Sequence, residues 1–214
     1  MLTRRNLLQA TAMAAVAMLT GCSGARGAAD DSAASDQAAP AEGSAAEGSA
    51  AAEAPAASGS VLVAYFSATG STEGIANALA EHLGADVFAI EAARPYTDAD
   101  LDYNDASSRT STERADARPE LAQVTPDGWD GYRTVLLGYP IWWGEAAWPL
   151  RTFSESNDFA GKTVVPFCTS ASSGIGRSGE GLAELAGGGD WRDGERFSAG
   201  ATDDATAWAD GLGL

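Results

Sequence analysis

The feature that most restricts the fold is a regular alternation of short apolar runs with amphipathic segments between residues 60 and 214. The runs are almost continuously apolar, which is typical of strands that are covered on both faces of a parallel sheet. In chain order, the strand candidates are "SVLVAYF" (60–66), "ADVFAIE" (85–91), "TVLLGY" (134–139), "KTVVPFCTS" (162–170) and the weaker "RFSAGAT" (196–202). Pro166 cannot donate a backbone hydrogen bond, so it predicts an edge or a bulge in the fourth run.

Amphipathic segments with helical spacing separate these runs. Ile75, Leu79 and Leu83 form one apolar stripe in "STEGIANALAEHL", and Gly84 predicts the end of that helix. The later helix candidates are "WPLRTFSESNDF", "SGEGLAELAG" and "DDATAWADGL". Strands that alternate with helices imply right-handed crossovers and an α/β fold. We predict a three-layer open sheet of five parallel strands in the order 2-1-3-4-5, with a ligand crevice at the carboxyl ends of strands 1 and 3.

Residues 92–125 fit none of these elements. The segment is polar and acidic, and it is too long for an ordinary connection between a strand and the next element. We therefore predict a partly ordered insertion near the crevice.

The first 59 residues carry no signal of a packed fold. Basic residues at Arg4 and Arg5, an apolar stretch and a small-residue end predict an export signal over 1–22. "TRRNLL" resembles a twin-arginine signal, and "LTGC" resembles a bacterial lipobox that would make Cys22 the acylated first residue of the mature protein. An ordinary cleaved signal that contains a cysteine is the alternative. The lipobox predicts a lipid anchor on the outer face of the bacterial cell membrane.

Residues 23–59 contain no aromatic residue and no Val, Ile or Leu. Such a segment cannot bury enough apolar surface to offset the entropy of ordering, so we predict a disordered tether. Residues 60–214 then form one domain of ordinary size.

The charge and the cysteines of the domain exclude several classes of protein. Of the 13 basic and 30 acidic residues in the chain, ten and 24 lie in residues 60–214, which gives this segment a formal charge of −14. That balance argues against a nucleic-acid partner. Cys168 is the only cysteine besides Cys22, and His82 is the only histidine. The sequence therefore predicts neither an internal disulfide nor a zinc site.

Four hydroxyl side chains follow the first apolar run, in "SATGST" (67–72). The start of a helix after a strand presents unpaired N–H groups and a positive dipole end, so this position favours an anion such as phosphate. The segment lacks the lysine of a Walker loop and the G-x-G-x-x-G pattern of dinucleotide sites. The competing interpretation is a plain helix cap, with Thr69 or Ser71 at the N-cap and Glu73 completing a capping box.

This S-x-T-G-x-T segment resembles the phosphate loop of the flavodoxin-like family, which binds the terminal phosphate of FMN. The resemblance implies hydroxyl donors and backbone N–H groups at Ser67, Ala68, Thr69, Gly70, Ser71 and Thr72. It also implies the flavodoxin-like fold and FMN as the cofactor.

Two further loops carry the same resemblance. "GYPIWWGEAAWPL" is similar to the family's flavin-flanking loop, and "CTSASSGIG" to its third flavin loop. The implied cofactor-binding residues of these two loops are Pro140, Ile141, Trp142, Trp143, Gly144, Thr169, Ser170, Ser173 and Gly174. We expect one of the two adjacent tryptophans to face the ligand and the other to pack, while core filling by both is the alternative. Where many relatives have proline after W-W-G-E-A, this chain has Ala147 and places Pro149 later.

Other reactive residues have simpler interpretations. His82 is expected on a solvated helix flank and Cys168 as a small buried residue. Arg151 and Arg177 follow the second and third loops, where a surface charge and a substrate contact are both open.

The resemblance implies a redox protein that carries electrons through bound FMN, with no catalytic side chain of its own. The partner would be a redox protein or a small electron acceptor, reached from the lipid-anchored position. An FMN-dependent reductase that takes hydride from NAD(P)H and reduces a quinone is an alternative, but basic residues for nucleotide phosphates are scarce. A flavin-free binding module on the cell surface is the third possibility.

Overall fold

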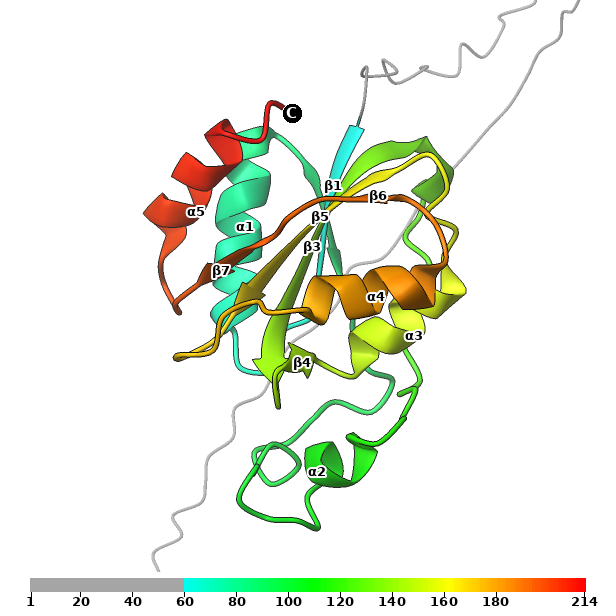
Figure 1. The fold of residues 1–214 in the computed structure, drawn as a ribbon, viewed down its shortest axis with the longest axis vertical. Helices are drawn as coiled ribbons and strands as arrows, with labels where there is room; N and C mark the ends of the chain where they lie inside the picture. Colours follow the sequence, from blue (N-terminus) through cyan, green and yellow to red (C-terminus); the bar gives the residue numbers. More distant parts are fainter. Residues whose placement is uncertain (1–59) are drawn as a thin grey trace, which may run out of the picture. The chain divides into compact units, whose positions relative to one another are not determined.

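A computed structural model describes residues 60–214 (Figure 1). The predicted export signal, Cys22 and the predicted tether 23–59 lie outside the described residues. Within the described part, none of the helices combines the length and apolar character that a membrane span requires.

The core is a seven-stranded sheet with the central order β2-β1-β3-β5-β6. Its strands are β1 (Ser60–Tyr65), β2 (Asp86–Ala89), β3 (Tyr132–Trp142), β4 (Glu145–Ala146), β5 (Thr163–Thr169), β6 (Asp190–Trp191) and β7 (Glu195–Phe197). All neighbours along the central order are parallel, while β4 pairs antiparallel with the end of β3. The predicted class and core topology are confirmed, and the predicted count of five strands is wrong.

The count is seven because β4 adds a strand beside the end of β3 and because the fifth position of the sheet is divided between two short strands. β6 pairs with Thr163 and Val164 at the start of β5, and β7 pairs with the residues from Phe167 to Thr169. Pro166 lies between these two stretches and has no N–H to donate to a neighbouring strand. The proline therefore marks an interruption of the pairing, although β5 itself lies inside the sheet.

Two helices cover each face of the sheet, which gives the predicted three layers (Figure 1). α1 (Ser71–Leu83) and α5 (Thr202–Asp210) lie on one face, and α3 (Pro149–Ser156) and α4 (Ser178–Ala186) on the other. Because side chains alternate along a strand, neighbouring residues of β1 join different cores. Val63 packs with Ile75 and Leu79 of α1, whereas Leu62 packs in the cluster that contains Phe153 of α3.

The segment 92–125 is an ordered insertion that contains the short helix α2 (Arg109–Glu113), and the 3₁₀ turn η1 (Trp129–Gly131) follows it. An isolated bridge joins Ala92 to Leu121. The Thr152 hydroxyl of α3 donates to the Pro119 carbonyl at 2.8 Å. In Figure 1 the insertion lies beyond the carboxyl ends of the strands, near β4. The insertion is thus more ordered than predicted, and its expected place near the crevice agrees with the structure.

Candidate functional site

A cleft of about 680 Å³ opens at the carboxyl ends of β1, β3 and β5. It brings together the first loop, the hairpin after β3, the end of β5 and part of the insertion. Its lining residues are Ser67, Ala68, Thr69, Ser71, Thr72, Leu101, Tyr103, Thr110, Pro140, Ile141, Trp142, Trp143, Thr169, Ser170, Ala171, Ser198 and Ala199. This is the position that parallel α/β topology favours for a ligand.

The first loop leaves its backbone donors free. Gly70 is the N-cap of α1 with φ of 85°, a conformation that favours glycine. No side chain caps the helix, so the capping box that competed with the anion-site interpretation is not formed. The Gly70 amide donates to the Ser67 hydroxyl at 3.1 Å.

The remaining amides of this loop have no acceptor within residues 60–214. They belong to Ala68, Thr69, Ser71 and Thr72. Unpaired N–H groups at a helix start need an acceptor from water or a ligand. The loop therefore offers a set of neutral donors suited to an anion.

One hydroxyl pair joins the first loop to the end of β5. The hydroxyls of Thr72 and Thr169 lie 2.8 Å apart, and the two residues are 1% and 4% exposed. One hydroxyl donates to the other, so the second keeps its own hydrogen for another acceptor. Because both residues line the cleft, the pair can supply one hydroxyl donor to a bound group.

The aromatic loop after β3 is a tight hairpin. Trp142 pairs with Glu145 across a two-residue turn, in which Trp143 has φ of 50° and Gly144 has φ of 83°. Positive φ at both central positions is the type I′ pattern. Trp143 is the only described residue other than glycine with positive φ, and a bulky side chain is costly there. Such strain often accompanies a functional position.

Both tryptophans line the cleft, and both also pack. The ring of Trp143 stacks on Trp148 at 5.9 Å and 18°, while Trp142 meets Phe66 and Tyr96 edge to face at 5.6 and 5.1 Å. The structure therefore does not assign lining to one tryptophan and packing to the other, and which of them contacts the ligand stays a prediction.

The substituted position Ala147 has a role in closing this hairpin. Its N–H donates to the Pro140 carbonyl at 3.2 Å, a bond that proline could not make. Pro149 instead occupies the first turn of α3, where a missing N–H costs little.

The insertion holds Trp142 in place through Tyr96. The Tyr96 hydroxyl donates to Glu113 at 2.5 Å, and Glu113 also binds the Arg109 guanidinium at 2.6 Å. That guanidinium lies 3.9 Å from the centre of the Tyr96 ring. Burial, followed by the bond to Glu113, raises the pKa of Tyr96 above its ordinary range. The phenol therefore stays protonated and keeps its donor at neutral pH.

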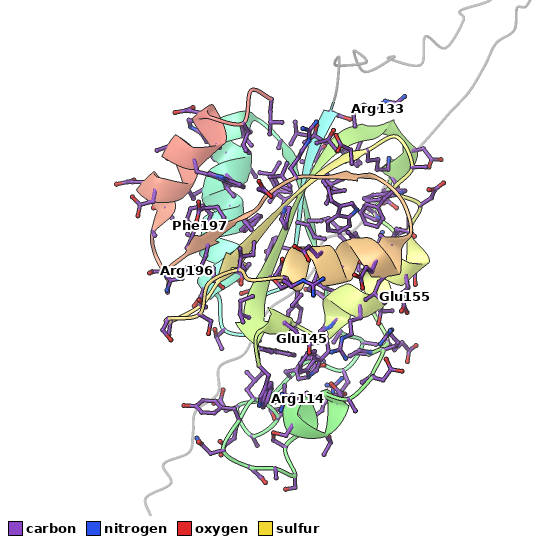
Figure 2. All side chains as sticks on the ribbon, viewed as in Figure 1. Arg114, Arg133, Glu145, Glu155, Arg196 and Phe197 are labelled. Carbon is purple, nitrogen blue, oxygen red and sulfur yellow. The ribbon has the colours of Figure 1, made fainter. Side chains whose placement is uncertain are left out.

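The third loop lies only partly at the cleft. Thr169 and Ser170 line it, whereas Ser173 and Gly174 are exposed and are not among the lining residues. The Ser170 hydroxyl donates to the Ser173 carbonyl and accepts from Arg196 Nε. Arg196, labelled on β7 in Figure 2, also donates to the Ser170 carbonyl at 2.6 Å. Ser170 is thus fixed by protein contacts.

Sequence reasoning missed six residues of the cleft. They are Leu101, Tyr103, Thr110, Ala171, Ser198 and Ala199. The first three belong to the insertion, which carries no regular periodicity that would place its side chains. Gly70 and Gly144 were expected in the site but do not line the cleft.

Arg151 is buried and has a structural environment, unlike the surface position considered for it. It binds Glu145 of the hairpin at 2.7 Å and the Arg114 carbonyl of the insertion at 3.3 Å. Figure 2 shows Glu145 and Arg114 near each other at this end of the molecule. Arg177 is exposed and pairs with Glu180. His82 lies 2.7 Å from Asp210 on α5.

Comparisons with known proteins agree with this geometry. The model of a family described as flavodoxin matches residues 60–212. No curated protein gives a significant match to the chain. A "putative flavoprotein" from Bacteroides uniformis ATCC 8492 is 40% identical, with 71% of this chain and 98% of that chain covered and a TM-score of 0.67.

Two further solved structures extend the comparison. A similarly described protein from Bacteroides eggerthii DSM 20697 is 38% identical, with 73% and 99% coverage and a TM-score of 0.66. A flavoprotein from Lactobacillus acidophilus NCFM, solved in complex with FMN, is 20% identical, with 70% and 99% coverage and a TM-score of 0.53. That level of identity shows a shared fold.

Proposed function

Because the chain belongs to the flavodoxin family over residues 60–212, we propose that it binds FMN in the cleft and transfers electrons through it. One observation carries this proposal. The cleft joins a set of unpaired amides and hydroxyls to an aromatic wall, which matches a ligand with an anionic tail and a planar ring. The FMN complex of the Lactobacillus protein, which has the same fold, supports this choice of cofactor.

The polar end of the cleft fits the phosphate. Its donors would be the free amides of the first loop, the hydroxyls of that loop and one hydroxyl of the Thr72–Thr169 pair. The free amides are those of Ala68, Thr69, Ser71 and Thr72, and the loop hydroxyls are those of Ser67, Thr69 and Ser71. A dianion on neutral donors is reasonable at a helix start, where the dipole and the amides act together. The domain's charge of −14 makes such local donors necessary, because the surrounding field repels an anion.

The aromatic end fits the ring. Trp142 and Trp143 line the cleft, and stacking on aromatic rings stabilises planar ligands. FMN, when bound, supplies the electron-transfer chemistry. The protein would hold the ring, limit water and set the charge around it. We expect a low reduction potential, since an acidic and aromatic environment disfavours added negative charge.

We favour an electron carrier over an NAD(P)H-dependent reductase. Most basic side chains near the cleft are already paired, as Arg109 is with Glu113 and Arg151 with Glu145, so few remain for nucleotide phosphates. Rapid mixing of the purified protein with NADPH should leave the flavin oxidised, while dithionite should reduce it. Bleaching by NADPH would instead support the reductase.

We also propose export and a lipid anchor through Cys22, on the sequence of the first 22 residues alone. Labelling of cells with a tagged fatty acid should modify the full chain and not a Cys22→Ala variant. Equal labelling of both chains would contradict the anchor.

The phosphate assignment is tested by a double variant, Thr69→Val with Thr72→Val. Loss of two donors to an anion should weaken FMN binding by roughly 100-fold, since each such bond contributes on the order of 1.5 kcal/mol or more. Purified wild-type protein should be yellow and the variant nearly colourless. Thr206→Val on α5, outside the cleft, is the matched control and should bind like wild type. Unchanged FMN retention in the double variant would move the phosphate elsewhere, and a colourless wild type that takes up no FMN would favour a flavin-free binding module.

A further inference from the structure

Tyr103 is an aromatic side chain held open at the mouth of the cleft. Tyr103 is 74% exposed, and it lines the cleft together with Leu101 of the same loop. An aromatic ring buries a large apolar area when it is covered. Of the large apolar side chains that are exposed within residues 60–214, Tyr103 is exposed most.

The loop that carries Tyr103 is fixed by short-range hydrogen bonds. The Asp100 carbonyl accepts from the amide and the hydroxyl of Thr110, at 3.0 and 2.8 Å. On the other side of Tyr103, the Asn104 amide donates to Asp102 and the Ser107 hydroxyl to Asp105. Tyr103 is thus presented by an ordered loop, and a ligand that contacts it would not have to order that loop first.

The same part of the insertion is joined to the aromatic hairpin. The Trp148 indole N–H donates to the Thr110 carbonyl at 2.9 Å, and Tyr96 packs on Trp142. The insertion and the hairpin therefore form two walls of one cleft whose positions depend on each other. A planar group that enters between them meets apolar and aromatic side chains from both walls.

We propose that Tyr103 is a ring-stacking residue of the flavin site, so that the insertion supplies one side of the isoalloxazine site and the hairpin the other. This inference rests on the proposed function, because the ring is that of FMN. FMN fits this cleft better than a planar ring without phosphate, because the other end of the cleft carries donors for an anion. The acidic neighbours Asp102 and Asp105 would also oppose negative charge on a ring covered by Tyr103.

The test distinguishes contacts to the flavin ring from contacts to the phosphate. It uses two probes, FMN and lumiflavin, which has the ring but no phosphate chain. Binding to the full-length apoprotein is measured by flavin fluorescence. Tyr103→Ala should weaken the binding of both probes by roughly tenfold, whereas Tyr103→Phe and Tyr103→Trp should bind them like wild type. The Thr69→Val, Thr72→Val double variant should weaken FMN but leave lumiflavin unchanged.

Val124→Ala is the control for removal of an exposed apolar side chain from the same insertion. It should bind both probes like wild type, and the apoprotein melting temperature of Tyr103→Ala should equal that of wild type. If wild type binds FMN and Tyr103→Ala holds lumiflavin equally well, the stacking role is wrong and the proposed function stands. If wild type binds neither probe, the proposed function fails and the stacking role fails with it.

Discussion

The two ends of the sheet differ in how far their polar groups are hydrogen-bonded. At the amino ends of the strands, the buried Lys162 donates to the Trp129 and Tyr132 carbonyls at 2.7 and 2.8 Å. The Tyr132 hydroxyl donates to Asp86, and the Ser60 hydroxyl to the Gly131 carbonyl. At the carboxyl ends, by contrast, amides of the first loop lack acceptors within the described residues.

The contrast separates stability from function. Buried polar groups are normally paired, and an unpaired group costs free energy. The closed end follows that rule at Lys162, which is only 4% exposed, donates to two carbonyls and has its ammonium 4.7 Å from the centre of the Trp129 ring. The open end instead carries amides without an acceptor in the described residues, the exposed Tyr103 and the strained Trp143. Unpaired donors, an exposed aromatic ring and a strained residue around one cleft are typical of a ligand site.

The largest expected effect is on stability, from Lys162→Ala at the closed end. The change leaves the Trp129 and Tyr132 carbonyls without their donor and removes the packing of the side-chain stem. We expect the free energy of unfolding to fall by about 3 kcal/mol, measured by urea denaturation. Lys162→Met keeps most of the stem and should lose less. FMN affinity of the folded variant should stay within about twofold, and a larger change in affinity would show that the two ends are coupled.

Cys168 tests where the open end stops, because it lies at the carboxyl end of β5 but is fully buried. Burial raises the pKa of its thiol to about 12, so the folded protein keeps a proton that the unfolded chain releases above about pH 9. Its contribution to stability is present below that pH and is lost as pH rises through the folded pKa.

Between pH 9 and 10.5, wild type should therefore lose unfolding free energy more steeply than Cys168→Ala, with a difference in slope that rises toward about 1.4 kcal/mol per pH unit. Urea titrations at several pH values measure this. Parallel curves for the two proteins would mean that the thiol is accessible to water, and the strand end would then belong to the open region.

The smallest effect on stability is expected from Trp143→Asn in the hairpin turn. Asparagine tolerates positive φ and suits a type I′ turn before glycine, while the stack on Trp148 is lost. The relief of backbone strain and the loss of the stack oppose each other, so the free energy of unfolding should change by less than about 0.5 kcal/mol. FMN binding should weaken several-fold, because Trp143 lines the cleft. A loss of stability above about 1.5 kcal/mol with unchanged FMN binding would assign Trp143 to packing alone.

The sequence predicts the elements that obey simple periodicity. The helix predicted over 71–83 is found with those bounds, and Gly84 ends it in the left-handed conformation. The core strand order follows from the alternation of strands and helices. The split of the fifth strand was not predicted, because "RFSAGAT" is too weakly apolar to mark where pairing with β5 begins and ends.

The site is only partly predictable for a related reason. Topology places most of the predicted loop residues after β1, β3 and β5 at the cleft, but Gly70, Gly144, Ser173 and Gly174 do not line it. Tyr103 and Thr110 reach the same cleft through turns and side-chain hydrogen bonds within the insertion, which depend on three-dimensional contacts and leave no period in the sequence. The positive φ of Trp143 could not be predicted either, because bulky residues rarely adopt that conformation.

Calorimetric titration of the apoprotein with FMN and with riboflavin tests the central claim most directly. The two ligands share the ring and differ in the phosphate, which the free amides of the first loop would hold. We predict that FMN binds at least about 100-fold more tightly than riboflavin. Equal affinities for the two ligands, or no heat of binding with either, would contradict the account.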